Sequence, residues 1–426
     1  MEGTSPKTCL TGTTGSHERP KRKVMENTQK LGLDKVILII GLVIYGTGFS
    51  LLYVIFAPLS REIGLSINQF GVLIAISNVA LVFSSYYWGK RSQLIGRKKV
   101  FVIGLLSYGF AFLLFTFGIQ VGLWGVFNPI SLFIFLLIIR IIYGVLIGGI
   151  QPAAVAYMSD HTDSKDRTKG MALIGMAAGI GTMIGPVMGG TLAFIHPLFP
   201  MYCGALIALI GAGLAHKYLI QSIPEISESS QNKTLKFYDS RILPFLIGWA
   251  VAFMVFTSVQ IISAFYIQDQ LGITEPDQVI KFTSIALLSM ALTSTFMQAV
   301  VLQVLNISTE TLLRICFLIF GVVLISISLV SSLTQFFLAY AGMGIAFSMI
   351  TPSLNAAATL SVEPSEQGEV AGFLAGAPVV GMIFGPTIGT LLYNLDPTFP
   401  FYYGGLVAII LGAYFQFIKV NENIAD

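Results

Sequence analysis

An apolar run from residue 170 to 194 contains the stretch Gly181-Thr-Met-Ile-Gly-Pro-Val-Met-Gly-Gly190. The run is long enough to cross a lipid bilayer as an α-helix. Small residues recur at every fourth position, so they share one helix face and let a second helix pack closely against it. Pro186 cannot donate a hydrogen bond to the carbonyl of Thr182, which predicts a bend there. The small residues are Ala177, Gly181, Gly185 and Gly189, with Gly190 beside them.

The same pattern returns 200 residues later as Gly381-Met-Ile-Phe-Gly-Pro-Thr-Ile-Gly-Thr390. Gly381, Gly385, Pro386 and Gly389 repeat the first copy, and Thr390 takes the place of its last glycine. The correspondence continues without a gap into the segments that follow each copy. A repeat of this kind predicts that the chain consists of two similar halves.

The composition indicates an integral membrane protein. Of the 426 residues, 55% are hydrophobic and 11% are charged, whereas soluble domains average about 25% charged residues. A soluble fold of this length could not bury so much apolar surface. We therefore predict an all-α fold of twelve transmembrane helices. The expected spans are 36–57, 67–88, 99–119, 132–157, 170–194, 200–220, 242–264, 280–304, 312–330, 334–358, 370–392 and 400–419.

The distribution of Lys and Arg predicts the orientation. Of the 24 basic residues, 21 lie in segments on one side of the predicted membrane, Arg61 and Lys281 lie on the other side, and Arg140 lies within a span. By the positive-inside rule, both termini are then cytoplasmic and the chain lies in the cell membrane. The net charge of +3 reflects this topology, so no nucleic-acid partner is predicted.

Domain boundaries follow from the spans. Six spans separate the two copies, so two parallel six-helix bundles are expected around a central cavity. A polar N-terminal tail without regular structure is expected before them. The expected divisions are a cytoplasmic tail (1–35), a bundle (36–220), a cytoplasmic linker (221–241), a second bundle (242–419) and a C-terminal tail (420–426).

The second predicted span is followed by Gly89-Lys-Arg-Ser-Gln-Leu-Ile-Gly96-Arg97-Lys98-Lys99. This stretch resembles a signature of the major facilitator superfamily. That signature is Gly, three residues, Asp-Arg, one residue, Gly and then basic residues. Gln93 and Leu94 stand where the signature has its acid and its first arginine. The resemblance implies an inner turn that latches one half of the molecule against the other. The matching residues are Gly89, Gly96, Arg97, Lys98 and Lys99.

Arg140 is the one residue charged at neutral pH that the prediction places well inside the membrane. An arginine there costs about 2.5–3.5 kcal/mol on insertion scales, so it should face the protein interior or a wet cavity. Arg140-Ile-Ile-Tyr-Gly144 resembles the fourth-helix pattern of the superfamily, which is associated with proton coupling. The alternative is that Arg140 only binds backbone carbonyls. Many members of the family carry an acid in the first span; here the nearest carboxylates are Asp34 and Asp160.

The stretch from Gly181 to Gly190 resembles the antiporter motif of the 12-helix drug:proton antiporters, and this resemblance implies export. The alternative is that the glycines serve packing alone. The family also implies that helices one, four, seven and ten line the cavity. Apolar walls with a few neutral polar groups suit an amphipathic or lipophilic solute. The candidate lining residues are Tyr45, Tyr53, Asn78, Tyr143, Gln151, Gln260 and Asn355.

The sequence thus predicts a secondary transporter that exports a drug-like organic molecule by proton antiport. Its expected partners are the solute, protons and the lipid bilayer, and a monomer is expected. Export of an endogenous metabolite such as a siderophore, an uncoupled facilitator, and a membrane-embedded enzyme or receptor remain alternatives. All four histidines lie in tails, in loops or at a span end, and no hydrolase or phosphate-binding motif is present, which argues against an enzyme, a cofactor or a metal site.

One further hypothesis rests on charge alone. The loop 359–369 carries Glu363, Glu366 and Glu369 and no basic residue. It could pair with the basic loop 90–99.

Overall fold

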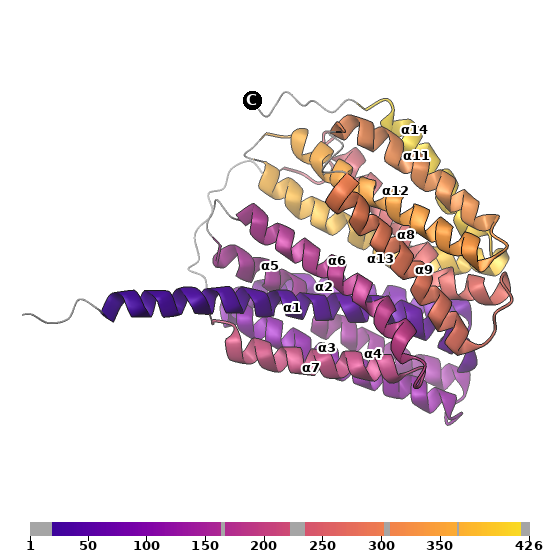
Figure 1. Ribbon diagram of the computed structural model, residues 1–426, viewed down its shortest axis with the longest axis horizontal. Coiled ribbons are helices and arrows are strands. Elements are labelled where there is room, and N and C mark those ends of the chain that lie inside the picture. The colour runs from indigo at the N-terminus through magenta and orange to yellow at the C-terminus, as the bar shows by residue number, and fades with distance from the viewer. Residues whose placement is uncertain (1–18, 163–166, 222–234, 302–306, 364–365, 419–426) are drawn as a thin grey trace, which may run out of the picture.

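The computed structural model describes residues 19–162, 167–221, 235–301, 307–363 and 366–418 (Figure 1). The first 18 residues of the predicted N-terminal tail, most of the predicted linker and the whole predicted C-terminal tail lie outside these ranges. Within them the regular structure is entirely helical. The helices are α1 (Arg19–Glu62), α2 (Ile67–Ile95), α3 (Arg97–Leu123), α4 (Pro129–Ile147), α5 (Ile150–Asp160), α6 (Arg167–Leu192), α7 (Phe199–Tyr218), α8 (Leu243–Asp269), α9 (Pro276–Phe296), the π-helical turn η1 (Met297–Val301), α11 (Thr309–Ser328), α12 (Leu333–Leu360), α13 (Gln367–Leu395) and α14 (Phe399–Phe415).

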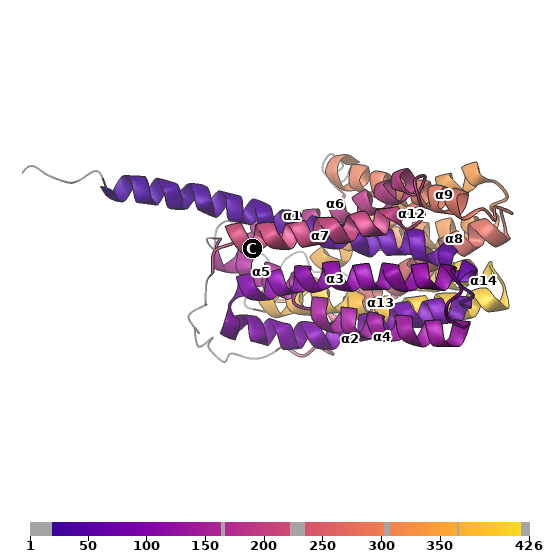
Figure 2. The same cartoon turned by 90° about the horizontal axis from the view of Figure 1, so that it is seen from below.

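Each predicted span has its counterpart in the described chain. Eleven helical segments there are long and apolar enough to cross a membrane, and α14 is a shorter apolar helix. The helices run roughly side by side as one bundle, and the start of α1 extends beyond it (Figures 1 and 2). The protein is therefore a multi-pass membrane protein, as the composition predicts.

The fourth span consists of two helices, α4 and α5, which together run from Pro129 to Asp160. The break falls at Gly148-Gly149, where α2 and α3 approach the backbone closely. A Cβ atom on Gly148 would lie 2.8 Å from the amide nitrogen of Ser85, and one on Gly149 would lie 2.6 Å from Val100 Cγ1. The glycine pair thus allows three helices to meet where a side chain would not fit.

The N-terminal prediction needs a correction. The polar tail was expected to lack regular structure, but α1 begins at Arg19 and continues into the first span. A helix that is anchored in the bundle can propagate into a polar flank, because each further residue adds one backbone hydrogen bond without a new nucleation step.

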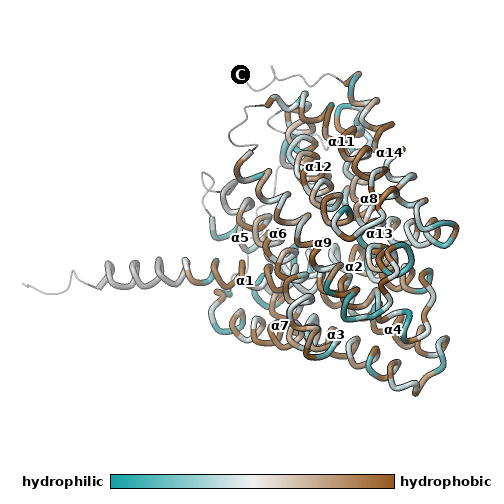
Figure 3. Tube along the Cα trace, turned by 45° about the vertical axis from the view of Figure 1, so that its right-hand side comes forward, coloured by the Kyte–Doolittle hydropathy of each residue, from teal (hydrophilic) through white to brown (hydrophobic). Residues whose placement is uncertain are grey.

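Hydrophobic residues follow one another along most of the length of the helices, and hydrophilic residues gather toward the two ends of the bundle (Figure 3). Phe83 is 75% exposed and Phe110 is 62% exposed. Such side chains are stable on the surface only against lipid. We name the two ends of the bundle by residues that lie there: the Arg97 end, with Asp160 and Glu366, and the Arg61 end, with Asp269 and Asn394.

The two halves repeat one helix contact. Gly181 and Gly185 of α6 pack against α1, where an added Cβ would lie 2.9 Å from the Gly46 Cα and 2.5 Å from the Thr47 carbonyl oxygen, respectively. Gly385 of α13 packs against α8, where a Cβ would lie 2.5 Å from the Met254 carbonyl oxygen. Both glycine stretches therefore occupy equivalent places, each holding the fifth helix of its half against the first. Pro186 and Pro386 lie inside these helices.

Candidate functional site: a buried arginine between two helical halves

Arg140 lies near the middle of the membrane-spanning part of α4. It is about 16 Å along the helix from Pro129, at a rise of about 1.5 Å per residue, and the hydrocarbon core of a bilayer is about 30 Å thick. The residue is 3% exposed. The prediction that Arg140 faces the protein interior is therefore confirmed.

Three helices hold the Arg140 guanidinium. Its Nη2 donates to Ser77 Oγ of α2 over 2.5 Å. Its Cζ lies 4.8 Å from the ring centre of Tyr143 and 5.5 Å from that of Phe115 on α3. Both distances allow a cation–π attraction, which strengthens where water is excluded. The alternative that Arg140 serves only to bind backbone carbonyls has no support in these contacts.

Tyrosines surround this arginine. The ring of Tyr108 lies 5.9 Å from that of Tyr143 and 6.0 Å from that of Tyr45. Tyr53 of α1 is 1% exposed and lies about two helical turns from Tyr45, on the same face of the helix. The hydroxyls of Tyr53 and Tyr108 are buried, and neither has a hydrogen-bond partner in the part of the chain that the structure describes. We call this group the arginine cage; it consists of Tyr45, Tyr53, Ser77, Tyr108, Phe115, Arg140 and Tyr143.

No carboxylate balances the charge of Arg140 within the described ranges. The ion pairs found there join Arg61 to Asp269, Arg97 to Asp160, Arg241 to Asp239 and Glu366, and Arg314 to Glu310. All of them lie near helix ends. A buried charge without a counter-charge is unfavourable. Among the described residues, the positive charge of Arg140 has no negative partner to balance it.

The other predicted cavity residues have separate surroundings. Asn78 of α2 donates to the Met382 carbonyl oxygen of α13 over 2.7 Å, a contact between the halves. Asn355 accepts from Trp249 Nε1 over 2.9 Å, within the second half. Gln260 is buried with its Oε1 unpartnered, and Gln151 is exposed. Only Tyr45, Tyr53 and Tyr143 of the seven candidates gather around Arg140; the cavity-lining role of all seven stays a prediction.

A groove of about 410 Å³ lies elsewhere, between α3 and α4. Its walls are apolar, and Leu106, Phe110 and Ile142 among its lining residues are exposed on the bundle surface. It therefore opens toward lipid, and it contains none of the predicted cavity residues.

The two carboxylates proposed for proton coupling lie at the Arg97 end. Asp34 is fully buried and accepts hydrogen bonds from the Tyr157 hydroxyl and, over 2.8 Å, from the Lys35 amide. Asp160 accepts from Arg97 Nε over 3.2 Å. Neither carboxylate is in ion-pair contact with Arg140.

The predicted inner-loop motif forms a one-residue turn. Gly96 links α2 to α3 with a φ of 95°, a conformation that favours glycine. Arg97 Nη1 donates to Ser92 Oγ over 2.6 Å, and Arg97 also pairs with Asp160. Both partners belong to the first half. The resemblance implied a latch between halves; in this conformation Arg97 instead fastens α3 to α5 of its own half.

The halves are joined at the Arg61 end. Arg61 of α1 donates through Nη1 and Nη2 to both carboxylate oxygens of Asp269 on α8, each over 2.7 Å, and the Tyr393 hydroxyl of α13 donates to the same carboxylate over 2.9 Å. Nearby, Asn394 Nδ2 donates to Asn68 Oδ1 over 2.5 Å. Bidentate geometry makes the arginine–carboxylate pair a strong, directional contact. Sequence reasoning missed this pair, because nothing local connects residues 208 positions apart.

Contacts between the halves continue to the middle of the bundle. An added Cβ on Gly190 would lie 2.8 Å from Ser284 Cβ of α9, and one on Gly71 would lie 3.1 Å from the Pro386 carbonyl oxygen. Asn78 marks the deepest hydrogen bond between α2 and α13. The hydrogen bonds that join the two bundles in the described chain thus lie between the Arg61 end and the midplane.

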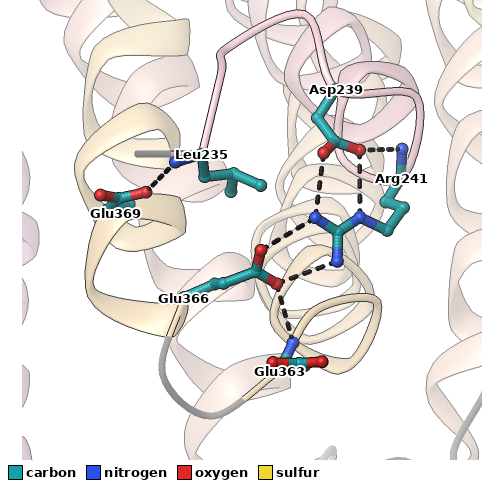
Figure 4. Close-up of polar contacts among 6 residues, drawn as sticks. All are labelled: Leu235, Asp239, Arg241, Glu363, Glu366 and Glu369. Atoms are coloured by element: carbon teal, nitrogen blue, oxygen red, sulfur yellow. Dashed lines mark hydrogen bonds and ion pairs between the residues drawn. The ribbon is translucent and has the colours of Figure 1, made fainter. Parts of the chain in front are cut away.

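At the Arg97 end the acidic loop binds the last residues of the linker (Figure 4). Arg241 donates to both oxygens of Asp239 and, over 2.9 and 3.0 Å, to both oxygens of Glu366, and the Leu235 amide donates to Glu369. The hypothesis that this loop pairs with residues 90–99 is therefore wrong for the described conformation. Arg241 is nearer because it directly precedes α8, the first helix of the same half.

The Arg241 cluster predicts a pH dependence. Hydrogen bonds from Arg241 hold the pKa values of Asp239 and Glu366 below their ordinary values. A carboxylate with a lowered pKa contributes stability above its unfolded pKa of about 4 and loses it as the pH falls through the folded value. In an Arg241→Gln variant, the Leu235–Arg241 amides should exchange about two- to five-fold faster at pH 7, the range expected for exposed ion pairs.

Amide exchange, corrected for its intrinsic rate at each pH, measures this effect. The difference between the wild-type protein and Arg241→Gln should shrink as the pH falls and should vanish once the pH is below the lowered pKa values of both carboxylates in the wild-type protein. An equal difference at all pH values would contradict the ion-pair explanation.

The family description Major Facilitator Superfamily matches residues 38–309 and 282–423. The chain belongs to the major facilitator superfamily. It is a transporter of this superfamily and not an enzyme, in agreement with the prediction from its motifs.

Among its relatives, this superfamily member is 27% identical over 394 residues to the Multidrug resistance protein 2 of Bacillus subtilis (strain 168), an alignment that covers 88% of this chain and 92% of the relative. It is 24% identical to the Multidrug resistance protein 1 of the same organism over 398 residues, or 90% and 95% of the two chains. A shorter match, 27% over 179 residues and 41% of each chain, joins it to the Tetracycline resistance protein, class B, of Escherichia coli. The resemblance to drug:proton antiporters stated from the motifs is thus confirmed at the level of family.

Solved structures show the same fold. The superfamily member resembles an inward-facing, unoccupied bacterial homolog of the human lysosomal transporter Spinster with a TM-score of 0.67, at 14% identity and with coverage of 95% and 97%. It resembles the human organic anion transporter MFSD10 with a TM-score of 0.61, at 15% identity and with coverage of 91% and 99%. At these identities the likeness concerns the fold alone.

Sequence reasoning missed four residues of this site: Ser77, Tyr108 and Phe115 in the arginine cage and Arg61 at the junction of the halves. Ser77 precedes the candidate Asn78 and faces a different helix. Tyr108 and Phe115 lie among apolar residues of the third span, where an aromatic residue gives no signal beyond hydrophobicity.

Proposed function

We propose that this transporter exports a small amphipathic organic molecule from the cytoplasm by alternating access. The proposal rests mainly on the position of the arginine cage. The cage lies near the midplane, at the depth where the hydrogen bonds that join the two halves from the Arg61 end come to an end. Contacts toward the Arg61 end separate the cage from that side. The basic residues favour placing the Arg97 end, and both termini, in the cytoplasm.

The chemistry of the cage supports an aromatic or amphipathic solute. Its walls are rings, and its polar groups are one guanidinium and several hydroxyls. Aromatic faces bind flat apolar bodies without strict directionality, while a few polar groups orient the solute. The relatives named as multidrug and tetracycline resistance proteins support export as the direction.

Proton influx would supply the driving force. Asp34 and Asp160 are the proposed proton acceptors, and Asp160 is the better placed because its ion pair fastens α5 to Arg97. Protonation of Asp160 would remove the charge that holds Arg97. In this mechanism proton binding changes how the helices of the first half are tied together, while Arg140 sets the electrostatic field.

An uncoupled facilitator is the second candidate. One observation favours it: within the described ranges, no carboxylate lies in ion-pair contact with Arg140. A proton acceptor that acts directly on the central charge is therefore lacking from the contacts of the cage.

Transport by purified protein in liposomes tests both candidates. Export of a fluorescent amphipathic probe is measured with an imposed pH gradient and again after nigericin collapses that gradient in potassium-balanced buffer. Antiport predicts that accumulation against a concentration gradient stops while downhill movement continues. Accumulation that is insensitive to nigericin would reject proton antiport, and equal probe movement in empty liposomes would reject transport itself.

Alternating access predicts that joining the halves at the Arg61 end stops export. In a chain with its native cysteines replaced by serine, Asn68→Cys and Asn394→Cys are combined and treated with a short bismaleimide. The cross-linked protein should retain less than about a tenth of its export rate, because the site can no longer open to that side. Each single cysteine variant under the same treatment is the control. Full export by the cross-linked protein would contradict a moving Arg61 end.

A further inference from the structure

The arginine cage contains more buried hydrogen-bond donors than the structure satisfies. Arg140 Nε, Tyr53 Oη and Tyr108 Oη are buried and have no hydrogen-bond partner among the described residues. Arg140 makes its one hydrogen bond within the described chain to the neutral Ser77 hydroxyl. Buried polar groups in folded proteins are normally paired, so a group of unpaired donors around a cation calls for an acceptor from outside the chain.

The positions of the charged residues indicate whether that acceptor is an anion, a neutral group or a cation. Every carboxylate of the described residues lies toward one of the two ends of the bundle or beyond it. They are Glu26, Asp34, Glu62, Asp160, Asp239, Asp269, Glu275, Asp277, Glu310, Glu363, Glu366, Glu369 and Asp396. Arg140 is thus the sole formal charge of the described chain near the midplane. The field at the cage is positive, which attracts an anion and repels a cation.

We propose that the arginine cage binds the anionic group of the transported solute, so that the substrates are amphipathic organic monoanions such as carboxylates, sulfonates or phenolates. The guanidinium presents paired N–H donors that match two oxygens of a carboxylate or sulfonate and can both donate to the single oxygen of a phenolate. The hydroxyls of Tyr53 and Tyr108 supply further donors, and the rings of Tyr45 and Tyr143 contact the organic body. The inference rests on the proposed transport function and specifies its substrate class.

The hydroxyls of Tyr53 and Tyr108 provide a way to distinguish an anion-binding cage from a cage that only fills space. A buried hydroxyl without a partner lowers the stability of the empty protein. If Tyr53 and Tyr108 only fill space, replacing them with phenylalanine stabilises the protein and leaves binding unchanged. If their hydroxyls donate to a bound anion, the same changes stabilise the empty protein and weaken binding.

An anionic substrate also alters the energetics of export. The interior of a cell is electrically negative. At a potential of about 100 mV, a monovalent anion at equilibrium is about 50-fold more concentrated outside the cell than inside it. Export of an anion by this protein therefore depends on the membrane potential, with or without proton coupling.

Two probes on one xanthene skeleton test the substrate class. Fluorescein methyl ester is an anion at pH 7.5 and rhodamine 123 is a cation of nearly the same size. Binding to the purified full-length protein is measured by fluorescence anisotropy at low ionic strength, and transport is measured in liposomes with a potassium diffusion potential. We expect the anion to bind at least about ten-fold more tightly than the cation, the discrimination expected from one unpaired charge.

Variants of the cage residues test whether the anion binds at the arginine cage. Arg140→Gln should reduce anion binding at least about ten-fold, the loss typical of a charge-assisted contact, and Arg140→Lys should restore part of it. Tyr53→Phe and Tyr108→Phe should each raise the melting temperature and weaken anion binding several-fold. Lys217→Gln, at the exposed end of α7, removes one positive charge outside the cage and should leave binding unchanged. Equal binding of both probes, binding of neither, or anion binding unaffected by Arg140→Gln overturns the proposal.

The binding and transport measurements distinguish failure of the proposed anion site from failure of the proposed transport function. If the anion binds through Arg140 but neither probe crosses the membrane, the anion site stands and the proposed function falls. If rhodamine 123 is exported and the anion is not bound, the transporter function stands and the anion site falls.

Discussion

A Gly185→Leu variant is expected to lose export almost completely. Gly185 lies where α6 crosses α1, and a Cβ atom there would come within 2.5 Å of the Thr47 carbonyl oxygen and 2.8 Å of the Leu51 amide nitrogen. Both atoms belong to the helix backbone and cannot rotate away. A leucine would therefore push α6 off α1, and overpacking of this kind costs about 1–3 kcal/mol or more. We expect export to fall by more than about 100-fold, because small displacements at a packed helix contact have effects of this size on activity.

The same helix supplies the control for this prediction. A Cβ atom on Gly179 would meet nothing within 4 Å, so Gly179→Leu adds the same side chain without a clash. Export from everted vesicles, normalised to the amount of inserted protein, is measured for both variants together with the melting temperature. Gly179→Leu should be near wild type in both measurements. Wild-type export by Gly185→Leu would show that the close contact between α6 and α1 is not required.

The second large effect is expected at Arg140. Arg140→Gln should abolish accumulation of the solute against a gradient and lower uphill export by at least about 100-fold, because the proposed mechanism gives the central positive charge a direct role in transport. The stability of the variant should move in the opposite direction. An arginine near the membrane centre costs about 2.5–3.5 kcal/mol on insertion scales, and glutamine removes the charge that causes most of this cost.

This opposition of activity and stability identifies the role of Arg140. If the arginine only held the helices together, its loss would lower the melting temperature and export in parallel. If it serves transport, the melting temperature stays level or rises while uphill export disappears. Uphill export and thermal unfolding of the purified protein are the two measurements, and Lys217→Gln is again the charge-matched control. If the Arg140→Gln variant exports solute uphill at the wild-type rate, Arg140 is not required for transport.

One helix connects these features. Along α1, Tyr45 and Tyr53 contribute to the arginine cage, the segment around Thr47 receives the glycine face of α6, and Arg61 forms the ion pair at the junction with the second half. Tyr53 and Arg61 are about 12 Å apart along the helix axis. A tilt of α1 would therefore change the cage and the junction together. This explains why a substitution in the glycine face, which touches neither, should stop export.

Several features of the fold could be predicted from local patterns. The helical spans follow from runs of apolar residues, and the two halves follow from the repeat of Gly181–Gly190 at Gly381–Thr390, because both signals are contained in short stretches. Arg140 stood out because a charge in an apolar run is rare for a definite energetic reason. The helical start of α1 at Arg19 was not foreseen, since a polar flank has no periodic signal of its own.

The partners of the singled-out residues depended on packing. Asn78 and Asn355 looked alike as polar residues in apolar spans, yet one bonds across the halves to Met382 and the other bonds to Trp249 within its own half. Arg97 was expected to join the halves and instead pairs with Asp160 of the same half. The acidic residues near 366 were expected near loop 90–99 and instead bind Arg241.

By itself the amino-acid sequence determined which segments cross the membrane, that they form two related halves, and that one positive charge lies among them. These properties depend on residue types within a single helix or on a repeat, and both can be counted along the chain. Only the tertiary structure decided that the tyrosines of α1, α3 and α4 enclose that charge and that Arg61 meets Asp269. Such contacts depend on the rotation and depth of helices far apart in the sequence, and side-chain packing between helices sets both.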